Sequence, residues 1–271
     1  MQNRARPLVT IEGYAVEGGF DQPFEPATCF SPTIALGRHE GPGDAAGLWD
    51  DYERALDLVT AMGLAGVRLT VEWARVEPRR GQLDESALER YGQVVRYANG
   101  LGLEVDVALV DAAWPSWLGL EAWLLPWVVP HVLEHARRLV THLPGITGLV
   151  AFTDRTRLVN GGYLLDTAPP WRAGASEDAA FARAQISVID HALADDSLVG
   201  PLLVTSSSTF SLDATPARVN AWRDATGSVT RLYARSLMAG HGPSASARGL
   251  IEREATGLRV TASSELLEAL R

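Results

Sequence analysis

The segment that most constrains the fold of this chain is Ile146–Asp154. An apolar run there ends abruptly in two polar residues, Thr153 and Asp154, and a basic turn follows at residues 155–157. Buried parallel strands have this sequence pattern, because both of their faces are covered and polar residues appear only where the strand leaves the sheet. The same shape recurs in three other segments, at residues 67–73, 105–111 and 201–206. We therefore expect a parallel sheet whose strand ends carry any functional site.

Helices are predicted between these strands, because apolar residues recur there at helical spacing. Their ranges are residues 49–62, 84–99, 130–143, 176–192 and 215–233. The fourth of them is expected to bury the face that carries Phe181, Ala184, Val188 and Ala192. Strands that alternate with helices at this spacing indicate a parallel sheet in an α/β fold.

Both ends of the chain are expected to add strands to this sheet. Residues 8–16 alternate as a first strand does, and residues 258–262 have the pattern of a sixth strand. Residues 17–48 form a long Gly- and Pro-rich stretch, of a length that is usually functional or disordered. Residues 28–36 within it are a candidate for a further strand. No low-complexity linker divides the chain, so we expect one domain over residues 1–271.

A (β/α)8 barrel of the TIM type is the fold that these elements favour. The chain has 271 residues, and such a barrel needs about 250. Only six strand–helix units can be recognised. Either the remaining strands are disguised in irregular segments, or the barrel is incomplete or altered in its last strands. The rival, an open doubly wound sheet, normally shows a glycine-rich phosphate loop after its first strand, and Gly18-Gly19-Phe20 does not match that pattern.

Composition and charge argue against several classes of protein. The net charge of -9 disfavours a nucleic-acid binder, which needs a basic face. No apolar run approaches the ~18 residues of a membrane span, and none follows the N-terminus as a secretion signal would. The single cysteine, Cys29, cannot form an intrachain disulfide, and no Cys/His cluster indicates a metal site. We expect a cytoplasmic protein without a metal or other cofactor, in which Cys29 is a buried apolar residue rather than a nucleophile.

The second predicted strand and its surroundings carry Arg68, Trp73 and the turn Arg75-x-x-Pro78. Related motifs flank them: Gly43-Asp-Ala-Ala before, and residues 109–118, Ala151-Phe-Thr-Asp154 and Gly162-Tyr163 after. In this order and spacing the set closely resembles the family 1 glycoside hydrolases, the β-glucosidases and their relatives, over most of residues 43–240. The resemblance implies a TIM barrel that binds a small sugar-like molecule at its strand ends.

The departures from that family fall on its catalytic residues. The resemblance places Asp154 where the family has the acid/base Glu of an Asn-Glu-Pro motif, with Thr153 before it. Asp111 stands where the family has a sugar-binding His, and Ala15 lies near the position of a sugar-binding Gln. The late Glu-Asn-Gly motif that carries the family's nucleophile has no counterpart in this sequence. The resemblance therefore implies the barrel but not the family's retaining reaction.

Carboxylates at the predicted strand ends are the candidates for catalysis, namely Asp154, Asp111 and Glu72. Glycoside cleavage needs two carboxyl groups, about 5–5.5 Å apart for retention or about 6.5–9.5 Å apart for inversion, and neighbouring strand ends can span the second range. In an apolar pocket Asp154 could serve as a general acid, with Asp111 or Glu72 assisting. The alternative is that these carboxylates form structural ion pairs with Arg68, Arg155 or Arg157.

Aromatic and hydroxyl side chains near the same strand ends are the candidates for substrate binding. Trp73, Trp114 and Trp171 could stack on a sugar or another flat ligand, although tryptophans under long loops also commonly belong to the core. Ser206 lies in a hydroxyl-rich run that could bind polyol groups, and such runs are also common in turns. Thr153 and Arg68 complete the expected site, and Arg68 also fits a charge partner inside the barrel.

Two functions are open at this point. The first is a glycosidase-like enzyme that acts on a small sugar-like or cyclic metabolite by carboxylate acid/base chemistry, as a hydrolase or as a repurposed lyase, isomerase or cyclase. The second is a non-catalytic pseudoenzyme that binds a carbohydrate or a partner protein. The carboxylate at Asp154 and the aromatic rim favour the first, and the missing Glu-Asn-Gly motif favours the second. A truncated barrel would expose sheet edges, so we also expect a homodimer.

Overall fold

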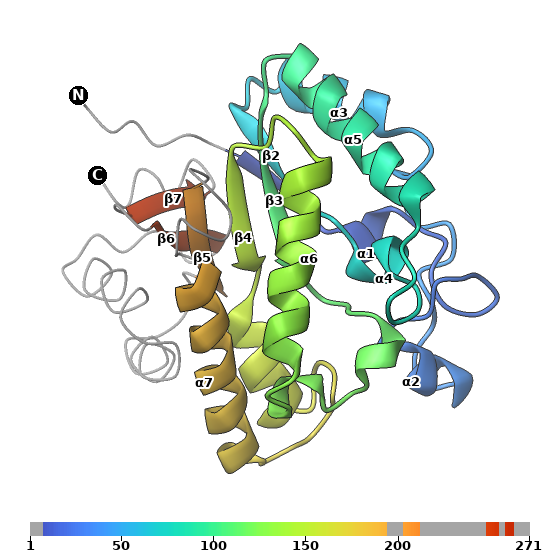
Figure 1. The fold of residues 1–271 in the computed structure, drawn as a ribbon, viewed down its shortest axis with the longest axis vertical. Helices are drawn as coiled ribbons and strands as arrows, with labels where there is room; N and C mark the ends of the chain where they lie inside the picture. The colour runs from blue at the N-terminus through green and yellow to red at the C-terminus, as the bar shows by residue number, and fades with distance from the viewer. Residues whose placement is uncertain (1–7, 194–202, 212–247, 255–257, 263–271) are drawn as a thin grey trace.

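The chain folds into one sheet whose strands follow each other in chain order (Figure 1). The computed structural model describes residues 8–193, 203–211, 248–254 and 258–262. The strands are β1 (Leu8–Ile11), β2 (Gly66–Thr70), β3 (Glu104–Val110), β4 (Gly148–Phe152), β5 (Leu203–Ser211), β6 (Arg248–Glu254) and β7 (Leu258–Ala262). The first five pair in parallel, whereas β5 with β6 and β6 with β7 pair antiparallel. This is a (β/α)8 arrangement that is altered in its last strands.

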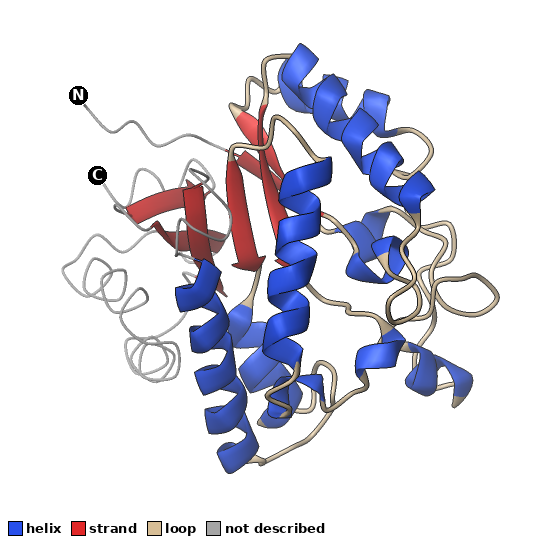
Figure 2. Ribbon diagram, in the orientation of Figure 1, coloured by secondary structure: helices blue, strands red, loops and turns tan. Residues whose placement is uncertain are grey.

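Helices connect the parallel strands and pack beside them (Figure 2). The long helices are α3 (Tyr52–Ala61), α5 (Glu85–Gly100), α6 (Val128–His142) and α7 (Ser176–Leu193), and consecutive members of this series are in contact. Shorter helices lie in the loops after the strands: α1 (Gly13–Val16), α2 (Ser31–Ala35), α4 (Trp73–Val76), η1 (Ser116–Leu118), η2 (Ala122–Leu124) and η3 (Arg157–Gly161). These loops lie at the carboxyl end of the sheet, which is the end that carries the active sites of TIM barrels.

The two faces of the parallel strands differ in polarity, because alternate residues of a strand point to opposite sides. Toward the helices, Val67 and Val105 are paired neighbours and belong to the hydrophobic core. Toward the other side, the next pair is Arg68 and Asp106, whose side chains lie 3.7 Å apart and are each 1% exposed. Within the described ranges β7 does not pair with β1. The described sheet is therefore an incomplete barrel.

Two predictions near the N-terminus are wrong. Residues 28–36 do not form a strand: Pro32 lies in the first turn of α2, and only an isolated bridge joins Thr28 to Pro115. The strand predicted over residues 8–16 ends at Ile11, and α1 follows it. Beyond Ile11 the backbone turns toward a different partner, because the Tyr14 N–H donates to a side chain on the loop after β2 rather than to a neighbouring strand.

The buried face of α7 also differs from the prediction. Phe181 and Val188 are 46% and 53% exposed. The helix instead buries Ala179, Ala182, Ile186, Ile189 and Leu193. Small alanines suit this face because α7 packs closely against both α6 and η2.

The last part of the sheet was only partly predicted. The fifth strand runs further than expected, to Ser211, and β6 (Arg248–Glu254) was not predicted at all. The sixth predicted strand is present as β7, but both late pairings are antiparallel rather than parallel. The helix predicted over residues 215–233 lies outside the described residues.

Candidate active site

Carboxylates from four successive strand ends gather at the carboxyl end of the sheet. Glu12 directly follows β1, Glu72 lies two residues after β2, Asp111 directly follows β3 and Asp154 lies two residues after β4. Because β1 to β4 are parallel and adjacent, their ends meet at one edge of the sheet. The three predicted catalytic residues therefore lie in one region, and Glu12 joins them.

The two carboxylate oxygens of Asp111 differ in their hydrogen bonding. The Thr153 hydroxyl donates to Oδ1, so this contact links the ends of β3 and β4. The Oδ2 atom is fully buried and has no hydrogen-bond partner in the described part of the chain. Burial raises the pKa of Asp111, while the bond from Thr153 and the charge of Arg157 act in the opposite direction. The Asp111 Oδ2 is therefore a buried hydrogen-bond acceptor, and the pKa of this carboxyl is shifted upward.

Asp154 is partly exposed and organises the turn that follows it. Its Oδ1 accepts a hydrogen bond of 2.9 Å from the backbone N–H of Arg157, at the start of η3. This is the geometry of a capping carboxylate, which satisfies a backbone donor that the helix itself leaves unpaired. Asp154 and Asp111 come from neighbouring strands that Thr153 links, so the structure brings these three predicted residues together.

Glu72 is enclosed rather than open to the mouth of the barrel. It is 1% exposed, and its carboxylate accepts a hydrogen bond of 2.7 Å from the Tyr14 N–H. Gly13 lies directly against it, since a Cβ atom at that position would come within 2.6 Å of the Glu72 Cγ. Burial, followed by the charges of Glu17 and Asp111, raises the pKa of Glu72 well above its ordinary value. Glu72 thus lies beneath the loop after β1.

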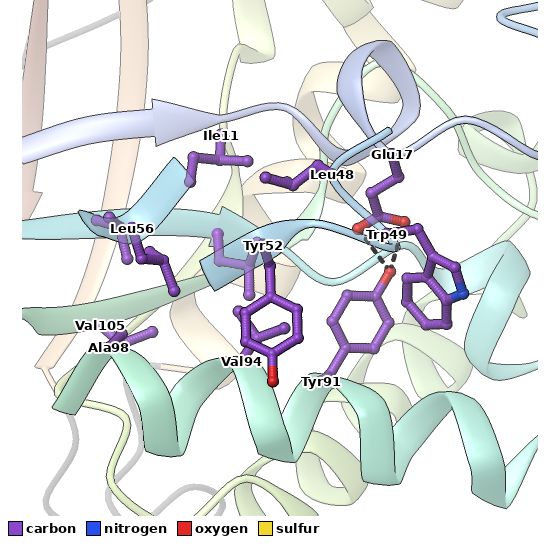
Figure 3. Close-up of a pocket in the computed structure, with 12 residues that line it drawn as sticks. Ile11, Glu17, Leu48, Trp49, Tyr52, Leu56, Tyr91, Val94, Ala98 and Val105 are labelled. Carbon is purple, nitrogen blue, oxygen red and sulfur yellow. Dashed lines mark hydrogen bonds between the residues drawn. The ribbon is translucent and has the colours of Figure 1, made fainter. Parts of the chain in front are cut away.

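A second, fully buried group of charges lies below the mouth. Arg75 donates to the Glu17 carboxylate at 3.1 Å. The Tyr91 hydroxyl donates to the same carboxylate at 2.9 Å, and Figure 3 shows this contact. The Arg75 guanidinium also lies 4.1 Å from the ring centres of both Phe20 and Trp49. Burial raises the pKa of Glu17 to about 7, against the opposing effects of Arg75 and Tyr91.

The hollow beside this group is not the candidate active site. It lies between the first three strands and helices α3 and α5, and Figure 3 shows Glu17 and Tyr91 at one end of it. Its other walls are apolar, and it encloses about 20 Å³, which is room for roughly one water molecule. It therefore faces the helices, away from the carboxylates at the mouth.

The predicted binding residues separate into buried and partly exposed ones. Trp73 is 1% exposed, stacks on His135 with ring centres 4.8 Å apart and donates to Glu77. Trp114 is also 1% exposed and donates to the Gly119 carbonyl. The protein itself covers both rings, so these two tryptophans belong to the core, which was the alternative to a binding role. A stacked ligand needs an accessible ring face, so neither ring offers one.

Trp171 is the predicted tryptophan that reaches the surface. It is partly exposed and stacks on His39 with ring centres 4.9 Å apart, at the rim formed by the loops after β1 and β4. Arg68, by contrast, is buried in the ion pair with Asp106, as expected of an interior charge partner. Ser206 lies within β5, opposite Arg253, and not in a turn after the strand.

Glu12 is the residue of this region that the sequence did not single out. It sits inside the stretch that was predicted as one long strand, where an alternating polar residue has no distinguishing signal. The resemblance offered no signal either, because Glu12 belongs to none of the motifs that carried it. Only the early end of β1 reveals that Glu12 stands at a strand end.

Two kinds of feature are absent from the described residues. Among the described residues, no group of three or more His, Cys, Asp or Glu side chains could hold a metal ion. In the same residues, no helix is both long and apolar enough to cross a membrane. The carboxyl groups at these strand ends interact with the positive charge of Arg157, which lowers the pKa of both Glu12 and Asp111.

Comparison with known proteins gives the family of folds. No family model matches the chain. The β-glucosidase-like protein SFR2, chloroplastic, of Oryza sativa subsp. japonica is 24% identical over 112 residues, which cover 39% of this chain and 17% of that protein. The β-glycosidase from Pyrococcus horikoshii has 20% identity and a TM-score of 0.65, with 75% of this chain and 47% of that chain covered.

Other solved structures agree with these two. An aphid myrosinase has 14% identity and a TM-score of 0.66, with coverages of 75% and 47%. Fpglu1 from Fervidobacterium pennivoraus has 14% identity and a TM-score of 0.69, with coverages of 82% and 59%. The chain therefore spans about half the length of the glycosidases that it matches. These likenesses confirm the resemblance to family 1 glycoside hydrolases and the TIM-barrel type of fold.

Proposed function

We propose that this protein is a glycosidase-like enzyme that acts on a small sugar-like or cyclic metabolite by carboxylate acid/base chemistry. The observation that carries the proposal is Asp111, whose buried Oδ2 has no partner and whose pKa is raised. A group with a pKa moved toward the working pH exchanges protons efficiently in a transition state. Its position at the carboxyl end of the sheet supports the same conclusion.

Asp154 assists Asp111 from the neighbouring strand end. In this proposal its carboxylate stabilises the positive charge that develops in the oxocarbenium-like transition state of glycoside cleavage. The family's own retaining reaction is not proposed, because the sequence contains no Glu-Asn-Gly motif for the nucleophile. A lyase, isomerase or cyclase would use the same proton-transfer groups on a cyclic substrate. A soluble, cytoplasmic location and a homodimer stay predictions.

The test is hydrolysis of a panel of aryl glycosides by the wild type and by Asp154→Asn. An asparagine keeps the capping oxygen that receives the Arg157 N–H, so the turn is preserved. General acid/base groups contribute about 10²–10⁴-fold to rate, and we expect a loss in kcat of that order, or somewhat less for an assisting charge. Absence of turnover in the wild type across the panel would contradict glycoside hydrolysis.

Asp84→Asn is the matched control for this experiment. Asp84 is also a capping aspartate, with Oδ1 accepting from the backbone of Ser86 and Ala87 at 3.0 Å, but it opens α5 on the outer ring of helices. The same chemical change there tests whether the loss comes from a weakened cap. We expect Asp84→Asn to keep wild-type turnover.

The alternative function is a non-catalytic pseudoenzyme that binds a carbohydrate or a partner protein. It is favoured by the missing Glu-Asn-Gly motif in this sequence. Calorimetric titration with neutral monosaccharides and their aryl glycosides distinguishes the two functions. Saturable binding without any turnover by the wild type would support the pseudoenzyme.

A further inference from the structure

A short segment after β1 covers the end of β2. It consists of residues 12–18, which include α1, and we call it the β1 cover. The Tyr14 N–H donates to the Glu72 carboxylate at 2.7 Å. Gly13 packs so closely that a Cβ atom at this position would lie 2.6 Å from the Glu72 Cγ. The β1 cover is therefore closed directly over Glu72.

Two carboxyl groups are buried while the β1 cover is closed. Glu17 belongs to the cover itself, Glu72 lies beneath it, and both side chains are buried. The point that a Cβ atom of Gly13 would occupy lies 2.7 Å from the Glu72 Oε1 and 3.1 Å from the Glu17 Oε1. Both carboxylates therefore border the same small space, and opening of the cover would bring both into contact with water.

Arg75 is the cation that faces these carboxylates. It forms an ion pair with Glu17 at 3.1 Å and donates to the Gly18 carbonyl at 2.6 Å. Within the described ranges, Glu72 has no ion pair of its own. If both carboxyl groups ionised in the closed state, a net negative charge would be left in a buried place, which is strongly unfavourable. Opening of the cover relieves this cost, because water then solvates both groups.

The pKa values of the two carboxyl groups agree with these contacts. Burial raises the pKa of Glu17 to about 7, although Arg75 and Tyr91 lower it. Burial, followed by the charges of Glu17 and Asp111, raises the pKa of Glu72 well above its ordinary value of 4.5. A raised pKa in the closed state favours closure at low pH. This advantage is lost as the pH rises from 4.5 through the raised values.

Other titratable groups face the two carboxylates from neighbouring elements. On α5, the Tyr91 hydroxyl accepts a hydrogen bond of 3.1 Å from the Glu72 N–H, and the charge of Glu72 also acts on the Cys29 thiol. Burial raises the pKa of both Tyr91 and Cys29 well above their ordinary values, so both stay neutral near pH 7. Arg75 stays charged, as arginine does in proteins. Asp111, at the end of β3, is a further group whose ionisation acts on Glu72.

We propose that the β1 cover is a pH-controlled lid, whose open fraction grows as the pH rises toward neutrality because opening brings Glu17 and Glu72 into water. The cover lies at the carboxyl end of the sheet, so its opening exposes the end of β2 and adds Glu72 to the carboxylates at the mouth. This inference does not depend on the glycosidase-like function, because it concerns the contacts of residues 12–18 alone.

Hydrogen exchange of the Tyr14 amide tests the lid, because this N–H reaches Glu72 only in the closed state. Exchange is measured by NMR on the full chain from pH 5.5 to pH 7.5 and is corrected for the intrinsic exchange rate at each pH. Linkage to one proton changes an opening equilibrium about tenfold per pH unit. We therefore expect the protection of the Tyr14 amide to fall by about tenfold or more per pH unit. Protection that stays constant in the wild type would overturn the lid.

The variant that combines Glu17→Gln and Glu72→Gln assigns the pH dependence to the two carboxyl groups. Both replacements keep the shape of the side chain but do not ionise, so the protection of the Tyr14 amide is expected to be nearly independent of pH. A fall as steep as in the wild type would assign the effect to another group, such as Asp111, and would overturn the proposal. If the double variant does not fold, the single variants decide: each must show a smaller fall than the wild type, and equal falls would overturn the lid.

Two controls separate opening of the cover from other effects of pH. Glu89→Gln changes an exposed glutamate on α5 that pairs with Arg96, and it is expected to show the wild-type fall. The Thr147 amide, which donates to the Val105 carbonyl at 2.7 Å, lies at the opposite end of the sheet and is expected to keep its protection. An equal fall at the Thr147 and Tyr14 amides would show that the whole chain loosens with pH and would overturn the lid.

Discussion

The mouth of the barrel and the buried group beneath it use the same residue types in opposite ways. Below, the Glu17 carboxylate is bonded by both Arg75 and Tyr91. At the mouth, Asp111 keeps one oxygen without a partner in the described residues, and Glu12 keeps an exposed carboxyl. Burial raises the pKa in both regions. The two regions therefore differ in the partners of their carboxylates and not in the direction of the pKa shift.

The largest difference between the two regions should appear in turnover. Asp111→Asn is expected to lower kcat by about 10²–10⁴-fold, because the amide cannot accept a proton. Glu17→Gln keeps a similar shape below the mouth and is expected to change kcat by less than about tenfold. Rates on one aryl glycoside at fixed pH compare the two variants. An equal loss of kcat in the two variants would show that the buried group takes part in the chemistry.

Stability should show the reverse pattern. Arg75→Met leaves the Glu17 carboxylate without its cation in a buried site, which typically costs about 3–5 kcal/mol. Arg96→Met is the matched control, because Arg96 pairs with Glu89 on the surface at 53% and 63% exposure, and exposed pairs contribute about 0–1 kcal/mol. Urea unfolding of both variants measures the difference. Similar losses of unfolding free energy would contradict the structural role of the buried group.

The buried strands could be predicted from sequence, because burial leaves a local record. In β2, β3 and β4 both faces are covered, so most of their residues are apolar, and the buried ion pair of Arg68 and Asp106 is the exception in mid-strand. In β6, Arg248 and residues 252–254 are charged, and the two apolar residues Leu250 and Ile251 between them are too few to mark a buried strand. A buried parallel strand is therefore visible to local patterns, and a charged antiparallel one is not.

The site was only half predictable, because its organising contacts join distant segments. Asp111 and Asp154 could be found since each follows an apolar run. Glu12 could not, because β1 ends where Tyr14 bonds to Glu72, a residue 58 positions away. The buried face of α7 was predicted wrongly for a similar reason. Two faces of this helix carry apolar residues at helical spacing, one of them with Phe181, and only the contacts with neighbouring elements decide which face is buried.

A smaller effect is expected in how the buried group responds to pH. The pKa of Glu17 is about 7 in the folded protein and 4.5 in its ordinary state, so folding favours its protonated form. Stability from this group is complete below about pH 4.5 and is lost as the pH rises toward 7. The full change is about 3 kcal/mol at 1.36 kcal/mol per pKa unit.

Glu17→Gln tests that response. Relative to the wild type, the variant is expected to gain unfolding free energy between pH 5 and pH 8, because its amide does not ionise. Arg75, Tyr91 and Glu72 face Glu17 and are present in both proteins, so the difference between the two curves reports the ionisation of Glu17 together with its effect on the raised pKa of Glu72. Parallel stability curves would show that Glu17 is ionised throughout this range.

The smallest expected effect concerns the hydrogen bond that Thr153 donates to Asp111. The Thr153 hydroxyl lowers the pKa of Asp111, so Thr153→Val should raise it and move the acidic limb of the pH–rate profile to higher pH. A bond worth about 1 kcal/mol changes the neutral rate by less than about tenfold. Thr153→Ser restores the hydroxyl and should restore the limb. A limb that moves equally in both variants would show that the Thr153 hydroxyl is not the cause of the shift.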